Sequence, residues 1–401
     1  MKHFKLLLAV IAFSFSLVTG CKKEMDTDSS INPDSQIGNQ AAVKQSNPLS
    51  AATKEKLAKL QASLPAGLDE KIKQRAALLS TTDPQYREMV RRAVGAIEPT
   101  PCNDNTAMNQ WLDQQLADWN GEIINYVLTT QMLDLPTYDA LVFENSSENQ
   151  YFGVKGEYTQ RLTKTFKDLQ RFWNIQSDDI VLAAMHGSML TDRDKLIRTY
   201  KSVYGLNTAS AQYYAEFVLA ILDAYPQLRN GNHPIFTFNA FALEGFYFPP
   251  VGQIPDKIIM GDGIMDAFTA IGYGDVAPQA ILAHEFGHQI QFQLNLFGEE
   301  SSPEATRRTE LMADAYSAYY LSHARGASMQ WKRVQQFLQV FFNIGDCGFT
   351  STGHHGTPTQ RMAAAQWGYN LANSAQKQGH ILTSQEFARL FDAQLPQLVK
   401  M

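Results

Sequence analysis

The chain shows a helical pattern of apolar positions over most of its length. Leu57, Leu60, Leu64 and Leu68 recur at spacings of three or four residues, which predicts a helix in that stretch. Comparable apolar stripes lie on a polar background further along the chain. They predict helices over residues 105–133, 158–173, 192–204 and 210–225. The pattern therefore predicts a mainly helical N-terminal region over residues 51–230, without indicating its role.

The pattern changes at the end of this region. Residues 234–243 are rich in aromatic and apolar side chains and poor in helix formers, which is typical of a strand. The glycines and prolines of residues 245–255 predict a loop or hairpin, and residues 257–260 predict a second short strand. The rest of the chain is again mostly helical. We expect an α+β, mainly helical fold, in which residues 231–401 form a domain with a small β-sheet beside its helices.

The N-terminus has the pattern of a targeting segment. Two lysines precede an apolar run over residues 6–18, and small residues then lead into Cys21. This arrangement resembles a bacterial lipoprotein signal, in which residues 1–20 are removed and Cys21 is acylated. The alternatives are an uncleaved anchor or a buried N-terminal helix. We expect residues 21–50 to form a flexible tether, and the protein to be lipid-anchored in the bacterial cell envelope, facing the periplasm or the cell surface.

The composition is that of a globular protein. The 401 residues, of which 44% are hydrophobic, suggest two or three folding units. The formal charge is −6 and no basic block stands out, so we do not expect nucleic acid as a partner. Beyond the N-terminal segment no apolar run is long enough to span a bilayer, so membrane contact is expected through the lipid alone. Cys102 and Cys347 either form a disulfide or remain buried thiols.

A histidine pair with metal-ligand spacing lies in the C-terminal half. Residues 284–288 read His-Glu-Phe-Gly-His within a stretch that predicts one helix, with Asp275 as its N-cap and Pro278 in its first turn. On a helix, His284 and His288 project from one face, so both imidazoles can reach one zinc ion. Glu285 lies on the adjoining edge, where a general base belongs.

A third ligand is available on the next predicted helix. Ser302 and Pro303 resemble an N-cap followed by proline at the first helical position. Glu310 and Asp314 share a face of that helix, so Glu310 can complete the metal site and Asp314 can orient a liganding histidine. The alternative is that both are ordinary surface acids. Their apolar neighbours favour a buried helix, however, and a buried acid needs a partner.

These motifs resemble those of the gluzincin peptidases, which carry H-E-x-x-H on one helix and E-x-x-x-D on the next. The segment around Asn239, followed by residues 258–261, resembles the strand region of the minimal gluzincins. Residues 345–347 and 355–361 resemble the tail of the bacterial group of neutral zinc metallopeptidases. The chain departs from that group around Asp314, where a Gln and a Cys are usual. The resemblance covers residues 232–370.

The resemblance implies a zinc endopeptidase that hydrolyses peptide bonds in a peptide or protein substrate. One zinc ion would be held by His284, His288 and Glu310, with Glu285 as general base. His355 and Arg361 are the candidates for donors to the developing oxyanion, and His354 is an alternative to its neighbour. A turn histidine and a surface arginine would explain the same residues without catalysis.

The predicted strand offers a candidate substrate site. It could bind an extended peptide as an added strand, or be a plain core strand, or both. The residues concerned are Asn239, Ala240, Phe241 and Ala242.

Two competing functions stay open from the sequence. A non-catalytic envelope scaffold could use zinc for stability alone, although a purely structural site has no need for Glu285. A zinc amidase acting on a cell-wall component would need the same residues, because the motif does not distinguish one amide substrate from another.

Overall fold

The computed structural model describes residues 49–63, 67–68, 70–72, 74, 105–249, 251–297, 302–343, 355–375 and 379–400. Cys21, Cys102, Cys347 and His354 lie outside the described residues, as do the expected lipid anchor and disulfide and all but residues 49–50 of the expected tether. Within the described residues, no helix has both the length and the apolar character needed to cross a membrane.

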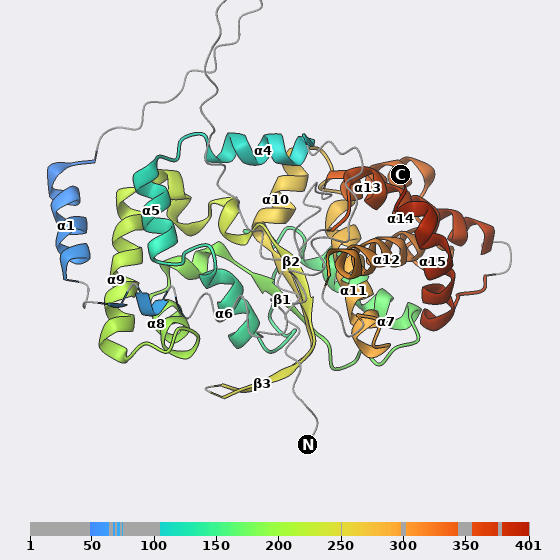
Figure 1. Cartoon of the computed structure of the whole chain (residues 1–401), viewed down its shortest axis with the longest axis horizontal. Coiled ribbons are helices and arrows are strands. Elements are labelled where there is room, and N and C mark those ends of the chain that lie inside the picture. The colour runs from blue at the N-terminus through green and yellow to red at the C-terminus, as the bar shows by residue number, and fades with distance from the viewer. Residues whose placement is uncertain are drawn as a thin grey trace, which may run out of the picture.

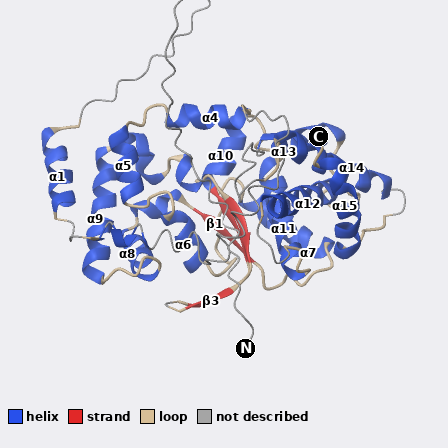
Figure 2. Ribbon diagram, viewed as in Figure 1, coloured by secondary structure: helices blue, strands red, loops and turns tan. Residues whose placement is uncertain are grey.

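A small mixed sheet lies at the centre of the molecule, between two groups of helices (Figures 1 and 2). Its strand order is β1 (Val181–Met185), β5 (Lys257–Gly261) and β2 (Ala240–Leu243). β1 runs parallel to β5, and β2 runs antiparallel to it. A separate hairpin, β3 (Phe246–Phe248) and β4 (Gly252–Ile254), projects from the sheet (Figure 1). The expected mainly helical α+β fold is confirmed.

The two faces of the sheet belong to two different hydrophobic cores. Successive side chains of a strand point to opposite faces, so Leu182, Ala184 and Ile258 face one core while Ala183 and Ile259 face the other. The first core is completed by α7 (Thr159–Phe172), α10 (Asp262–Ala270), α11 (Ala277–Gln293) and α12 (Pro303–Ser322). The second is completed by α5 (Gly121–Thr129), α6 (Leu135–Phe143), α8 (Arg193–Ser202) and α9 (Thr208–Ala224).

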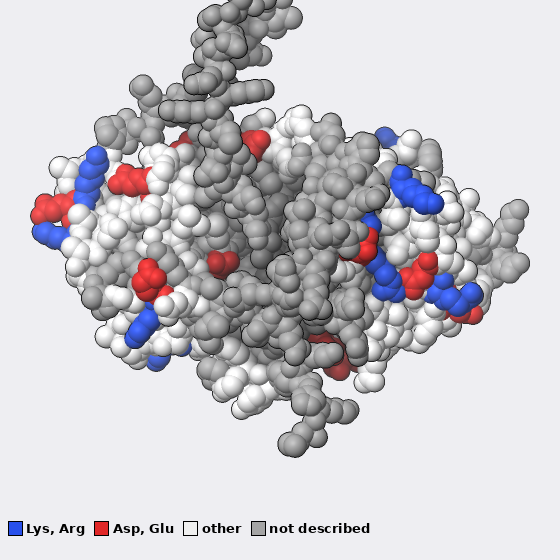
Figure 3. Space-filling model, in the orientation of Figure 1, with Lys and Arg blue, Asp and Glu red and all other residues white. Residues whose placement is uncertain are grey.

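The remaining elements surround these layers. α4 lies across the upper edge in Figure 1, and the C-terminal helices pack beside α12. The elements are α1 (Ala51–Ala62), α4 (Ala107–Leu116), α13 (Trp331–Asn343), α14 (Pro358–Ala375) and α15 (Ser384–Leu398), with short 3₁₀ turns η1 (Gly187–Thr191), η2 (Pro226–Gly231) and η3 (Pro234–Thr237). On the face shown in Figure 3, acidic and basic side chains lie intermixed.

Several predicted elements differ in their bounds. The single helix expected over residues 105–133 is two helices, because Asn120 caps a new start by accepting a hydrogen bond from the amide of Ile123 at 2.9 Å. The strand expected over 234–243 begins only at Ala240, since its proline-led first part forms η3. β1 was not predicted at all: its short apolar run lay inside a region with a helical pattern.

Of the two motif-bearing helices, α12 begins as predicted and α11 does not. Ser302 caps α12 as predicted, accepting from the amide of Ala305 at 3.0 Å, with Pro303 in the first turn. Asp275 as the N-cap of α11 was wrong. That position is taken by Val276 without a side-chain bond, and the Asp275 carboxylate instead pairs with Arg161 at 3.2 Å.

The sheet joins the two halves of the sequence. β1 comes from the region 51–230, whereas β2 and β5 come from the region 231–401. Both halves therefore contribute to the scaffold on which the motif-bearing helices rest.

A fully buried lysine connects this sheet to α6. Lys257, on the central strand, donates from Nζ to the carbonyls of Ala140 at 3.2 Å and Leu141 at 2.7 Å, near the C-terminus of that helix. Burial lowers the pKa of Lys257 to about 7, although Glu144 and Asp139 act in the opposite direction.

This pKa gives a test of the packing. Between about pH 7 and pH 10 the unfolded chain binds a proton on Lys257 that the folded chain lacks, so stability should rise with pH by up to about 1.4 kcal/mol per pH unit. The Lys257→Met variant should lack this rise, as measured by denaturant unfolding across that range. Exposed Lys164→Met should behave like wild type. Parallel pH curves for wild type and Lys257→Met would contradict the assignment.

Candidate metal centre

The close contact of α11 and α12 brings the motif residues together. Gly287 of α11 faces Ala313 of α12, and a Cβ atom at position 287 would lie 3.1 Å from the Cα and 3.3 Å from the Cβ of Ala313. Ordinary carbon contacts are about 3.5–4.0 Å, so a larger residue would push the helices apart. The glycine within the His-Glu-Phe-Gly-His motif thus permits Glu310 of α12 to reach the histidines of α11.

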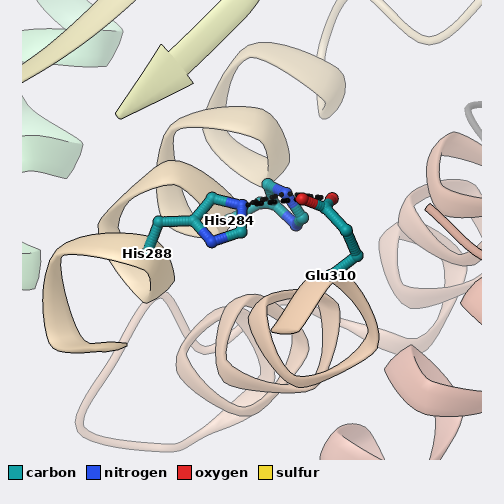
Figure 4. A group of neighbouring side chains, drawn as sticks. All are labelled: His284, His288 and Glu310. Atoms are coloured by element: carbon teal, nitrogen blue, oxygen red, sulfur yellow. Dashed lines mark hydrogen bonds and ion pairs between the residues drawn. The ribbon is translucent and has the colours of Figure 1, made fainter. Parts of the chain in front are cut away.

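Three buried side chains converge at this contact (Figure 4). Nε2 of His284 lies 3.1 Å from Nε2 of His288. Each Nε2 atom also lies 3.3 Å from a carboxylate oxygen of Glu310. Two ligand atoms at ~2.0–2.1 Å from a tetrahedral ion are about 3.3 Å apart. The spacing therefore suits one metal ion, and the three side chains form a buried group that can bind one.

His284 is oriented by a carboxylate and an arginine. Its Nδ1 donates to Asp314 at 2.8 Å, which leaves Nε2 directed toward Glu310. Arg361 in turn holds both carboxylate oxygens of Asp314, through Nε at 2.7 Å and one Nη at 2.6 Å. This network fixes the tautomer in which the nitrogen facing the group is the unprotonated one when a metal binds.

His288 is oriented by a residue that the sequence analysis missed. Its Nδ1 donates to the side-chain oxygen of Gln291 at 2.8 Å, and the Gln291 amide donates to the backbone carbonyl of Thr309 at 2.7 Å. Gln291 is fully buried on α11, three residues after His288. The sequence did carry a signal for this role: Gln291 is a polar amide on the buried face of a predicted helix, one turn from a ligand.

The electrostatics of the group favour a bound cation. Burial alone would lower the pKa of His284, but hydrogen bonds to Asp314 and Glu310 raise it to about 10. Burial would raise the pKa of Glu310, yet the neighbouring His288 and His355 and the histidine hydrogen bonds hold it well below its usual range. One oxygen of Glu310 is buried and has its nearest positive groups at 3.3 Å, in His284, and at 3.6 Å, in Arg361. A bound metal ion would supply the positive charge that the Glu310 carboxylate attracts.

Glu285 has a different environment from Glu310. It is buried, and one of its oxygens has no hydrogen-bond partner among the described residues. Burial raises the pKa of Glu285 above its usual value, while the charges of His284 and His288 oppose that rise. A buried carboxylate with a free oxygen beside three ligand atoms can accept a proton from a molecule bound there.

The group opens into a cleft. His355 and Arg361 line this cleft together with Glu285, as do Asn239 and Ala240.

The other two predicted substrate residues lie elsewhere. Phe241 points into the core on the opposite face of the sheet, and Ala242 lies in the core that holds the metal ligands. The structure thus brings the predicted ligands, base and downstream pair together, but only the first half of the predicted substrate strand lines the cleft.

None of the protein-family models, curated proteins or solved structures compared with the chain matches it. The chemistry of the site therefore has to be inferred from its own geometry.

The role of Gln291 can be tested by metal affinity. Gln291→Ala leaves His288 without its orienting acceptor, so affinity for a divalent metal should fall by about 10–100-fold. Competition with a chromogenic chelator measures the change. Gln293→Ala, on the same helix but exposed, is the matched control and should keep the wild-type affinity. Equal affinities for both variants would show that His288 needs no such support.

Proposed function

We propose that the protein is a metal-dependent hydrolase. The observation that carries this proposal is the buried Glu285 carboxylate, with one unbonded oxygen, beside the group of His284, His288 and Glu310. A metal that served only to stabilise the fold would be enclosed by its ligands and would gain nothing from a free carboxylate facing a cleft.

More particularly, we propose a zinc endopeptidase of the gluzincin type. Two histidines and one carboxylate are a donor set that zinc accepts in hydrolases, in which three protein ligands leave one coordination position open. When bound, zinc at such a site supplies a Lewis acid that acidifies water and polarises a carbonyl group. Glu285 takes the proton from the attacking water and later passes it to the leaving amine.

The outer edge of β2 supports a peptide as substrate. The amide of Gly261 donates to the carbonyl of Asn239 at 3.0 Å, which sets the alternation of this antiparallel pair. By that alternation, the backbone polar groups of Ala240 and Ala242 turn away from β5. No described residue pairs with them. An extended peptide could therefore add to this edge, next to the cleft that Ala240 lines.

The opposite edge of the sheet is closed. The outward amides of Leu182 and Ala184 on β1 donate to Ser147 and Gln150, each at 2.9 Å. Side chains satisfy one edge of the sheet, whereas no described residue pairs with the outward backbone groups of Ala240 and Ala242, both of which are buried. This contrast favours peptide binding at β2 over a strand that merely ends the sheet.

The two downstream candidates divide their roles in this proposal. The guanidinium of Arg361 holds Asp314 through two short hydrogen bonds and lies 3.6 Å from an oxygen of Glu310, so Arg361 positions His284 and Glu310. His355 is partly exposed, lines the cleft and lies close enough to Glu310 to lower its pKa. We therefore assign the donation to the developing oxyanion to His355.

The decisive variant is Glu285→Gln. It retains the shape of the side chain but removes the base, so zinc content and fold should persist while cleavage of an unbiased peptide library falls by at least about 100-fold. Mass spectrometry of the library and metal analysis measure the two outcomes. Exposed Glu304→Gln is the matched control.

Two outcomes would count against the proposal. Wild type with full zinc that cleaves no peptide would leave a scaffold, or an amidase acting on a cell-wall amide, as the better account. Wild-type cleavage by Glu285→Gln would remove Glu285 from the base role.

The proposed location has its own test. We propose that Cys21 is acylated and holds the enzyme at a membrane of the bacterial envelope through its lipid. Metabolic labelling with a radioactive fatty acid should label wild type and fail to label Cys21→Ser, which should leave the membrane fraction. Label retained on Cys21→Ser would refute the anchor.

A further inference from the structure

One helix of the N-terminal region reaches the cleft. Met108 and Asn109, both on α4, line it opposite residues that follow position 231. No other described residue of the region 51–230 does so. The motifs that resemble a peptidase begin at residue 232, so α4 belongs to the part of this chain for which those motifs say nothing.

Hydrogen bonds fix α4 at both ends. At its start, Asn343 of α13 accepts from the backbone amide of Met108 at 3.3 Å and from the hydroxyl of Thr106 at 3.4 Å. The Asn343 amide is itself held, because it donates to the carbonyl of Gln339 at 2.7 Å.

At the other end of α4, Arg229 donates to the side chain of Gln115 at 2.8 Å, and His233 donates to its carbonyl at 3.0 Å. These contacts place α4 as a fixed wall of the cleft.

The wall that α4 completes is mostly apolar, with the neutral amides of Asn109, Asn239 and Asn343 among its lining residues. Met108 is joined by Phe238, Ile264 and Ile281 in the lining, and Trp111 stacks on Phe238 with ring centroids 6.4 Å apart. The ionisable groups of the lining all belong to the proposed catalytic centre: His284, Glu285, Glu310, His355 and Arg361. The cleft therefore has its ionisable groups at the metal ligands, and only apolar side chains and neutral amides at the end under α4.

We propose that α4 makes this end of the cleft a pocket for an apolar side chain of the substrate, next to the bond that is hydrolysed. This inference rests on the proposed function and gives the N-terminal region the role of setting specificity. The flexible side chain of Met108 can adapt to branched and aromatic groups, whereas a charged side chain would lose its hydration and meet no opposite charge beside α4.

The test uses ligand binding, so that it does not depend on catalysis. N-acetyl amino-acid hydroxamates with glycine, leucine, phenylalanine or aspartate side chains are titrated calorimetrically into the zinc-loaded full chain. The leucine and phenylalanine compounds should bind at least about 10-fold more tightly than the glycine compound, and the aspartate compound should not.

Two variants of Met108 then locate the preference. Met108→Trp fills the pocket, so it should abolish the advantage of leucine and phenylalanine while leaving the affinity for the glycine compound unchanged. Met108→Ala enlarges the pocket and should shift the preference toward phenylalanine. Exposed Gln114→Trp, on the same helix, is the control and should bind all four compounds like wild type.

The results separate the two proposals. An unchanged preference in both Met108 variants, with zinc content intact, would overturn the pocket while leaving the hydrolase standing. Failure of wild type to cleave any library peptide would instead count against the hydrolase, and the hydroxamate series would still decide the pocket. If Met108→Trp does not fold, Met108→Ala alone decides, because an unaltered preference there contradicts the inference.

Discussion

The close approach of α11 and α12 at Gly287 is the constraint on which the site depends. Each helix alone presents polar groups on a buried face, which would be unfavourable without partners. At the separation that Gly287 permits, Glu310 meets both histidines, and Asp314 meets the far nitrogen of His284. The buried charges of α11 and α12 therefore find their partners only when the two helices pack together.

The charges of this centre cancel only when a histidine is protonated or a cation is bound. Arg361 offsets Asp314 through two hydrogen bonds, and the two histidines then face Glu310 and Glu285. Without a metal, protonation of a histidine has to neutralise Glu310, which agrees with the raised pKa of His284. A divalent ion would replace that proton and bind the same oxygen and nitrogen atoms. The centre therefore favours metal binding most strongly when the histidines are neutral.

The sequence predicted the local parts of this arrangement better than the long-range ones. Spacing along a helix placed His284, His288, Glu310 and Asp314, because α-helical geometry fixes which residues share a face. It could not predict β1, whose apolar run fits a strand or a buried helix equally well until its partner β5 is known. Nor could it bring α4 to the cleft, because that contact depends on Asn343, more than 200 residues away.

Gln289 explains how the sheet and the metal centre keep a fixed relation. It follows His288 directly, and its amide donates to the carbonyl of Leu243 on β2 at 3.1 Å and to that of Lys257 on β5 at 2.7 Å. The helix that carries two ligands is thereby attached to the end of β2, the strand whose outer edge has no hydrogen-bond partner among the described residues. Since strand and ligands cannot shift independently, a peptide added to β2 would meet the centre in one register. Gln289 and Gln291 thus give the motif helix two anchors, Gln289 to the strands and Gln291 to the Thr309 carbonyl of α12.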